Sequence, residues 1–311
     1  MRVETFADQL FFTTVRIEAE CPSGSWVGTG FVYAVETNKG TAHFVVTNKH
    51  VLEAAETVTV RMIQQDAAGG PRLGQATQIT IQDFGATAWS GHPDPSVDVA
   101  VMPAAAVLEA MASSGAAPFF RSVPPEVLLT EETAIELDAV EEINFIGYPN
   151  GLYDTANYLP ILRTGTTATP ISVDYQGKPA FLVDASVFPG SSGSPVCIAN
   201  RGTYLSRGGG VVVGSRVICL GVLAAVHVRA VQGTVDVLPS KLVSGFDEPI
   251  DLGIVFKASC IDECVSQILA LAGLVAVASS PSTPSPMAPS VADEAITNVG
   301  TGTEGATSSS G

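Results

Sequence analysis

The chain has 311 residues, of which 46% are hydrophobic, which is ample for a buried core in one bilobed domain or two small ones. Its formal net charge of −16 at pH 7, without any Lys/Arg-rich run, argues against a surface that binds nucleic acid. Its five cysteines and four histidines show no zinc-site spacing, so no metal centre is expected.

The N-terminal third of the chain consists of short β-rich runs. It does not begin with a basic segment followed by a long apolar one, so no secretory signal peptide is expected. Alternating apolar and polar residues predict a first strand over 10–18. Five further strands are predicted over 26–35, 42–48, 57–64, 77–84 and 97–102, with a loop over 66–74. About six strands suffice for one small antiparallel barrel.

The middle of the chain separates this region from a second β-rich region. Residues 103–114 are rich in alanine and predict a helix, whereas residues 115–134 contain three prolines and predict a linker. In the second region strands are predicted over 141–148, 158–168, 180–185, 195–199, 211–228 and 250–257. We therefore expect an N-terminal barrel lobe over 1–114, an interlobe linker over 115–134 and a C-terminal barrel lobe over 135–278.

The C-terminal end of the chain predicts a helix followed by a flexible tail. Residues 259–278 carry a mostly apolar helical pattern, expected to pack on the second barrel. Its uncharged apolar run, 268–278, is too short to span a bilayer, so packing is favoured over a membrane anchor. Residues 279–311 are mostly Ser, Pro, Thr, Ala and Gly, so we expect this tail to be disordered.

The cysteines predict free thiols. Their number is odd and no signal peptide precedes them, so a reducing, cytoplasmic location is expected. Cys197 and Cys219 fall on strands predicted to be neighbours, where packing is favoured over a disulfide bridge. Cys260 and Cys264 are four residues apart, on one face of the predicted C-terminal helix, and are expected in the core.

One loop carries the pattern of a nucleophile. Residues 188–196, with the sequence FPGSSGSPV, lie between two apolar runs. A glycine at 190 lets the backbone bend so that the N–H groups of Gly190 and Ser192 face one point, where an oxyanion could sit. Alone, such a loop is also consistent with an ordinary turn.

Two other segments supply a base and a carboxylate. The β-branched run 45–47 leads to His50, which opens a short helical pattern over 51–56. Asp98 interrupts the apolar run 97–101, where a buried carboxylate needs a hydrogen-bond donor such as an imidazole N–H. Taken singly, His50 is also consistent with a surface residue and Asp98 with a turn.

In this order the three segments resemble the chymotrypsin-like (trypsin-like) serine proteases. The resemblance implies an all-β fold with two antiparallel six-stranded β-barrels and a C-terminal helix. It also implies His50 as general base, Asp98 as its partner, Ser192 as nucleophile, and the N–H groups of Gly190 and Ser192 as the oxyanion hole. No metal or organic cofactor is implied, and the partner would be a protein or peptide substrate.

Further motifs refine this resemblance. Residues 28–31 (GTGF) resemble the family's Gly-x-Gly-Phe strand, and residues 147–151 (GYPNG) resemble a turn of bacterial and Deg-type members. The chain departs from digestive-type members in having Ser191 for an aspartate, Ser194 for a glycine and no disulfide framework. A serine at 194 would strain the loop if that site needed a positive φ. The chain therefore resembles a bacterial intracellular, Deg-type-related branch without a peptide-binding appendage.

Specificity and activity are also inferred from the resemblance. The base of the specificity pocket would be Ser186 and its wall would include Ala224, which predicts small or medium uncharged side chains at the cleavage position. The main hypothesis is an active serine endopeptidase. The alternative is a catalytically inactive trypsin-like module that binds or senses proteins. A structural β-barrel with accidental motifs fits the composition but not the ordered triad.

Overall fold

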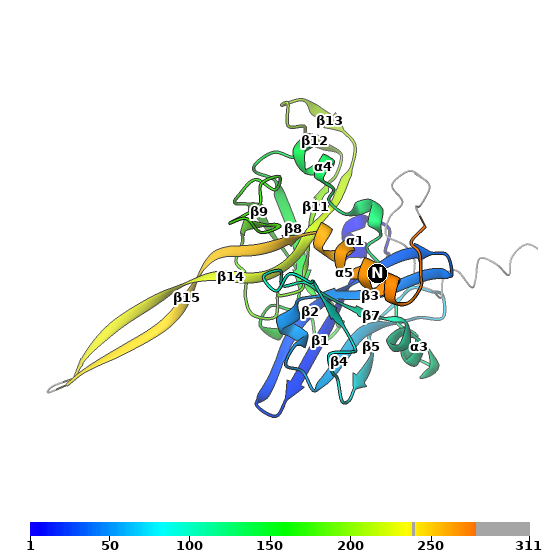
Figure 1. Ribbon diagram of the computed structural model, residues 1–311, viewed down its shortest axis with the longest axis horizontal. Coiled ribbons are helices and arrows are strands. Elements are labelled where there is room, and N and C mark those ends of the chain that lie inside the picture. The colour runs from blue at the N-terminus through cyan, green and yellow to red at the C-terminus, as the bar shows by residue number, and fades with distance from the viewer. Residues whose placement is uncertain (238–239, 278–311) are drawn as a thin grey trace, which may run out of the picture.

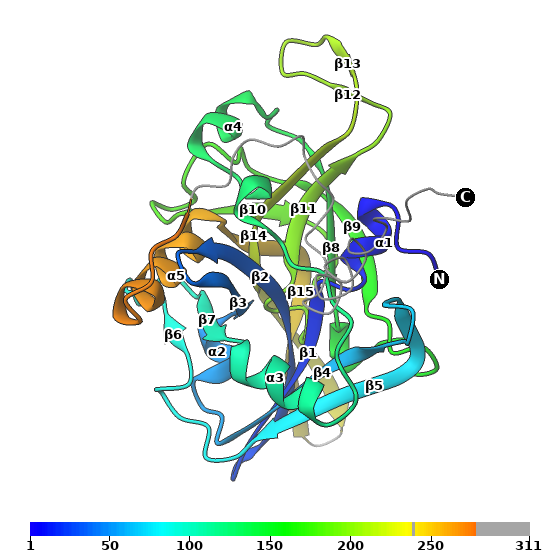
Figure 2. The ribbon, with the colours of Figure 1, turned by 90° about the vertical axis from the view of Figure 1, so that its right-hand side faces the viewer.

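The computed structural model describes residues 1–237 and 240–277, and the side chains of these residues outside 225–250. The predicted disordered tail, 279–311, lies outside the described residues. Two β-rich halves make up the molecule, one from each half of the sequence (Figures 1 and 2). The helices are short apart from α3 and α5. They are α1 (Phe6–Leu10), α2 (Lys49–Leu52), α3 (Ala105–Ser113), α4 (Glu131–Glu136) and α5 (Ser259–Leu271), with 3-10 turns η1 (Pro125–Val127) and η2 (Pro149–Gly151).

The first half is an antiparallel sheet. Its strands are β1 (Thr14–Cys21), β2 (Gly24–Thr37), β3 (Gly40–Thr47), β4 (Thr57–Gln65), β5 (Pro71–Ile81), β6 (Ser90–Gly91) and β7 (Ala100–Pro103). They lie in the order β5-β4-β1-β2-β3-β7-β6. Val15, Ile17 and Ala19 alternate along β1 as fully buried residues, as the predicted periodicity requires. The sheet has seven strands rather than the expected six, because the two-residue strand β6 adds to the edge at β7.

The second half is a closed barrel of six strands, in the order β10-β15-β14-β11-β8-β9. Its strands are β8 (Glu142–Gly147), β9 (Ile161–Thr167), β10 (Ala180–Asp184), β11 (Pro195–Asn200), β14 (Arg216–Val237) and β15 (Ser240–Lys257), and a small hairpin is formed by β12 (Thr203–Leu205) and β13 (Val211–Val213). The all-β fold with a six-stranded barrel and a C-terminal helix is confirmed. Strands β14 and β15 run past the barrel as a long paired arm (Figure 1).

Helix α5 is shorter than predicted and packs on both halves of the molecule. It ends at Leu271 because Gly273 takes a φ of 63° and the N–H groups of Gly273 and Leu274 bond the carbonyls of Ala270 and Leu269. It lies against β6 and β7 of the first sheet as well as against β14 and β15, beside β7 in both views (Figures 1 and 2). The expected packing on the second barrel is confirmed, and α5 packs on the first sheet as well.

Polar contacts bind α5 to the first half of the molecule. The buried Tyr33 hydroxyl donates to Asp262 at 2.7 Å, and His92 lies 2.9 Å from Glu263. Burial raises the pKa of Tyr33, so this phenol stays a donor at neutral pH.

None of the helices in the described residues has the length and apolar character needed to cross a bilayer.

The cysteines lie where the sequence predicted. Cys197 on β11 is the register partner of Cys219 on β14, and both are buried free thiols. Cys260 and Cys264 are also buried and free, on the face of α5 that packs into the core. The predictions of packed thiols on adjacent strands and of a buried cysteine pair on one helix face are confirmed.

Candidate active site

His50 is positioned by the junction between β3 and α2. Asn48, fully buried, ends the extended backbone and is the N-cap of α2. Its side-chain amide donates to the main-chain carbonyl of Asp98 at 2.5 Å. This bond ties the start of the helix to the segment that carries the carboxylate, so His50 and Asp98 are held together by backbone as well as by side chains.

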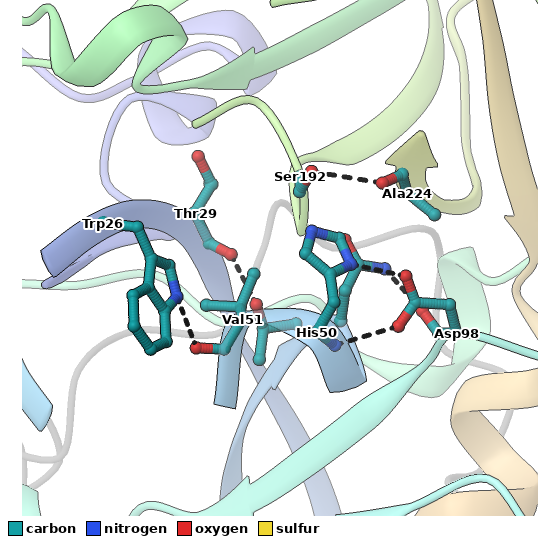
Figure 3. Close-up of polar contacts among 9 residues, drawn as sticks. Trp26, Thr29, His50, Val51, Asp98, Ser192 and Ala224 are labelled. Atoms are coloured by element: carbon teal, nitrogen blue, oxygen red, sulfur yellow. Dashed lines mark hydrogen bonds and ion pairs between the residues drawn. The ribbon is translucent and has the colours of Figure 1, made fainter. Parts of the chain in front are cut away.

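The Asp98 carboxylate contacts His50 through both of its oxygens. Asp98 Oδ2 lies 2.5 Å from Nδ1 of the ring, and Oδ1 accepts the His50 backbone N–H at 3.2 Å (Figure 3). Asp98 lies in the loop before β7 rather than within a strand, anchored by the fully buried Val97 and Val99. A carboxylate at Nδ1 favours the tautomer that carries its proton there and leaves Nε2 free to accept one.

Ser192 lies in the loop between β10 and β11, three residues before β11 begins. The loop is held by Gly193 N–H, which donates to Leu223 at 2.7 Å, and by Ser192 C=O, which accepts from Thr29 N–H at 2.9 Å. The Ser192 hydroxyl donates to the Ala224 carbonyl at 3.1 Å rather than to His50. In Figure 3 the ring nitrogen of His50 that does not face Asp98 lies on the side of Ser192. Rotation about one Cα–Cβ bond redirects this hydroxyl.

Two loop glycines are required by their surroundings. Gly193 has a φ of 88°, and a Cβ there would stand 1.8 Å from the carbonyl oxygen of Thr29. Gly190 has a φ of 86°, and its Cβ would stand 2.4 Å from the carbonyl oxygen of Tyr148. Both the positive φ and the close backbone approach exclude other residues at these positions.

The backbone donors expected to form the oxyanion hole have no partner inside the described part of the chain. The N–H groups of Ser191, Gly193 and Ser194 all donate to main-chain carbonyls, whereas those of Gly190 and Ser192 do not. Because backbone N–H groups in folded proteins are normally paired, two unpaired donors in one loop are available to a ligand. Their role as an oxyanion hole stays a prediction.

The two serines that depart from the family pattern are buried within the loop. Ser194 is absent from the described residues with a positive φ, so the backbone strain considered from the sequence does not arise. Its hydroxyl instead fills the space beside Gly147, where a Cβ would come within 2.3 Å of it. Ser191 is 1% exposed, and its hydroxyl has no hydrogen-bond partner in the described residues. The glycine at 147 is therefore matched to the serine at 194.

Thr29 is a site residue that the sequence reasoning did not single out. Its fully buried hydroxyl donates to Gly190 C=O at 2.7 Å and accepts the Tyr148 N–H at 3.1 Å. Its backbone N–H holds Ser192, as described above. The GTGF pattern indicated only a strand near the nucleophile loop, and the threonine between the two glycines was the available signal.

Replacing Thr29 by Val is expected to lower kcat about 10- to 100-fold, because the Gly190 peptide loses the bond that orients it. Thr13→Val is the matched control, since Thr13 is equally buried and its hydroxyl donates to Leu10 at 2.8 Å, away from the loop. Both variants should lose about 1–3 kcal/mol of stability. Equal kcat values for the two, measured on one peptide substrate, would show that Thr29 has only a structural role.

The residues expected to form the specificity pocket are only partly described. Ser186 lies on the surface in the loop after β10, whereas the side chain of Ala224 is buried. Phe188, 38% exposed, lies under the guanidinium of Arg163, 5.0 Å from its ring centroid, a contact the sequence did not predict. The side chain of His227, three residues after Ala224, lies outside the described ones. Among described residues no group of His, Cys, Asp and Glu could hold a metal ion.

One family model and several solved structures are similar to this chain. A model of the trypsin-like peptidase domain matches residues 28–204. The HtrA-type protease AlgW with a tripeptide is 14% identical with a TM-score of 0.45, over 88% of this chain and 65% of that one. The serine endoprotease from Yersinia pestis is 13% identical with a TM-score of 0.43, over 87% of this chain and 68% of that one. A search among curated proteins gives no match.

Proposed function

Because this chain belongs to the family of trypsin-like peptidase domains, we propose that it is a serine endopeptidase in which His50, Asp98 and Ser192 act as the catalytic triad. The observation that carries the proposal is the double contact of Asp98 with the ring and the backbone of His50. A carboxylate bonded in this way holds an imidazole in one tautomer and one orientation, which is what a general base requires.

The proposed reaction follows from this arrangement. Ser192 Oγ attacks the peptide carbonyl while His50 Nε2 takes its proton, and Asp98 stabilises the imidazolium that forms. The N–H groups of Gly190 and Ser192 bind the oxyanion of the tetrahedral intermediate. His50 then gives its proton to the leaving amine, and the acyl part of the peptide stays bonded to Ser192. Water, deprotonated by the same imidazole, attacks this acyl group and releases it from Ser192.

The cleavage preference is a second part of the proposal. Ser186 and Ala224 bring no charge to the pocket that would receive the side chain on the acyl side of the scissile bond. A cationic residue there would lose its hydration without gaining an ion pair, so small or medium uncharged residues are favoured.

One observation favours the alternative of an inactive, protein-binding module. The Ser192 hydroxyl is bonded to the Ala224 carbonyl and not to His50. In free enzymes, however, catalytic hydrogen bonds are commonly long or misaligned and tighten only when substrate binds. An active peptidase is therefore the better-supported function.

The test is cleavage of a diverse peptide library, with new termini identified by mass spectrometry. The wild-type protein should cut, and Ser192→Ala should not. Ser206→Ala, in the β12–β13 hairpin, should cut like the wild type. Equal cleavage by Ser192→Ala would contradict the proposed nucleophile. Cleavage after mainly Arg and Lys would contradict the uncharged pocket while leaving the triad intact.

A further inference from the structure

A small pocket lined by both polar and apolar side chains lies between the two halves of the molecule. It is formed by β1 and β4 of the first sheet and by the segment 148–160 of the second half. Its cavity volume is about 20 Å³, enough for one or two water-sized groups. The polar residues that line it include Arg16, Arg61, Tyr148, Tyr153 and Tyr158.

The pocket carries an excess of positive charge. Arg16 and Arg61 both pair with Glu18, so one carboxylate is shared between two guanidinium groups. The Arg16 side chain is only 14% exposed, and its Nε has no hydrogen-bond partner within the described residues. Burial, followed by the charge of Arg61, lowers the pKa of Arg16. A buried donor and an unmatched charge both favour an anionic ligand.

Aromatic side chains hold the two arginines in place. The Arg16 guanidinium lies 5.3 Å from the centroid of the Tyr153 ring, and Arg61 Nη1 donates to the Tyr153 hydroxyl at 3.4 Å. Tyr153 in turn stacks on Tyr158, with centroids 6.0 Å apart, and meets the edge of Tyr148. A guanidinium that is ordered before binding loses little entropy when it bonds a carboxylate, and its planar fork matches that ligand.

The pocket is joined to the nucleophile loop by one tight turn, η2. On one side of the turn, a Cβ at Gly151 would lie 3.8 Å from Arg16 Nη2 and 3.7 Å from Val27. On the other side, Asn150 N–H donates to Pro189 at 2.5 Å, and a Cβ at Gly190 would lie 3.2 Å from Gly151 N. The cationic pocket and the expected oxyanion hole are thus separated by the width of this turn.

We propose that Arg16 and Arg61 form a carboxylate subsite, which binds an acidic side chain or the terminal carboxylate of a peptide held at Ser192. This inference rests on the proposed endopeptidase function, because the peptide must lie across the turn between pocket and nucleophile. The carboxylate replaces part of the interaction that the arginines make with Glu18 and satisfies Arg16 Nε. Peptides with a carboxylate at the matching distance from the scissile bond are therefore preferred.

The test uses peptides that share one cleavage sequence and carry a single Glu, or Gln as control, at successive positions on either side of the scissile bond. At one position Glu should raise kcat/KM about tenfold over Gln, mainly through KM, and added salt should reduce the difference. A parallel pair with a free or an amidated C-terminus distinguishes a side-chain carboxylate from a terminal one. Equal rates for Glu and Gln at every position, and for both termini, would overturn the proposal.

Variants of the charged residues should change the preference for the carboxylate in opposite directions. Residues with a merely structural role would not give this result. Arg61→Gln should abolish the preference for the carboxylate, and Arg16→Lys should weaken it. Glu18→Gln should increase the preference, because it removes the carboxylate that competes for both arginines. Arg72→Gln, an exposed arginine on β5, should leave it unchanged. A Glu18→Gln protein that folds and shows no stronger preference would contradict the assignment.

Binding can be measured without cleavage, which separates this inference from the proposed function. Fluorescently labelled Glu and Gln peptides are titrated into the full-length Ser192→Ala protein, and their Kd values are compared. Tighter binding of the Glu peptide, lost in Ser192→Ala with Arg61→Gln, supports the subsite even if the wild-type protein proves inactive. Equal Kd values for the two peptides refute the subsite even if cleavage is observed.

Discussion

Replacing Asp98 by Asn is expected to lower kcat about 10⁴-fold while the protein remains folded. The amide is nearly the same size, but it can present an N–H where the carboxylate accepts from Nδ1 of His50. The ring then favours the tautomer with its proton on Nε2, the nitrogen that must accept from Ser192. The kinetics of a fluorogenic peptide chosen from the library measure this effect, and KM should change little.

Asp94→Asn is the matched control for that variant. Asp94 lies in the same loop, where its carboxylate accepts the Ser96 N–H at 2.8 Å without contacting His50. Its kcat should stay within about twofold of the wild type, since surface substitutions away from the site have small effects. If Asp98→Asn retained wild-type kcat, the carboxylate would have no part in positioning the base.

Replacing Gly193 by Ala is expected to cost more than about 3 kcal/mol of stability and to abolish activity. The new Cβ would meet the carbonyl oxygen of Thr29 at 1.8 Å, and the residue would be held at a φ of 88°. Relief requires the nucleophile loop to move away from β2, which breaks the bond between Thr29 N–H and the Ser192 carbonyl. Chemical denaturation at pH 7 measures the loss.

Gly202→Ala separates the two causes of the stability loss in Gly193→Ala, which are the close contact with Thr29 and the strain of a positive φ. Gly202 has a similar φ of 78°, but no atom lies within 4 Å of its added Cβ. It should cost only the backbone strain, about 1–2 kcal/mol, and leave kcat unchanged. Equal losses for Gly193→Ala and Gly202→Ala would mean that the close approach of Thr29 contributes nothing.

The sequence predicted the parts of the site that depend on local pattern. A β-branched run that ends in a polar turn placed His50 at the start of α2, and the Gly/Ser/Pro loop placed Ser192 between two strands. The pairing of Asp98 with His50 was implied by the resemblance to trypsin-like serine proteases, and the need of a carboxylate in an apolar run for a hydrogen-bond donor was consistent with it. The placements of His50 and Ser192 each depend on the residues of a single segment, which the sequence shows directly.

The parts that the sequence did not predict depend on contacts between distant segments. Thr29 is a plain strand residue until β2 is brought against Gly190 and Tyr148. In the sequence, Arg16 is only one polar position of an alternating strand. It becomes part of a cationic pocket because the loop around Tyr153 lies against it. Likewise, the apolar pattern of α5 continues past Leu271, where a glycine with positive φ ends the helix.

Labelling with a fluorophosphonate tests the central claim most directly, because this probe reacts with a serine only when a neighbouring base activates it. Intact-mass and peptide mapping should find one adduct per wild-type chain, on Ser192, and no adduct on the folded His50→Ala protein. An adduct on a different serine, or a folded wild-type protein that does not react, would contradict the account.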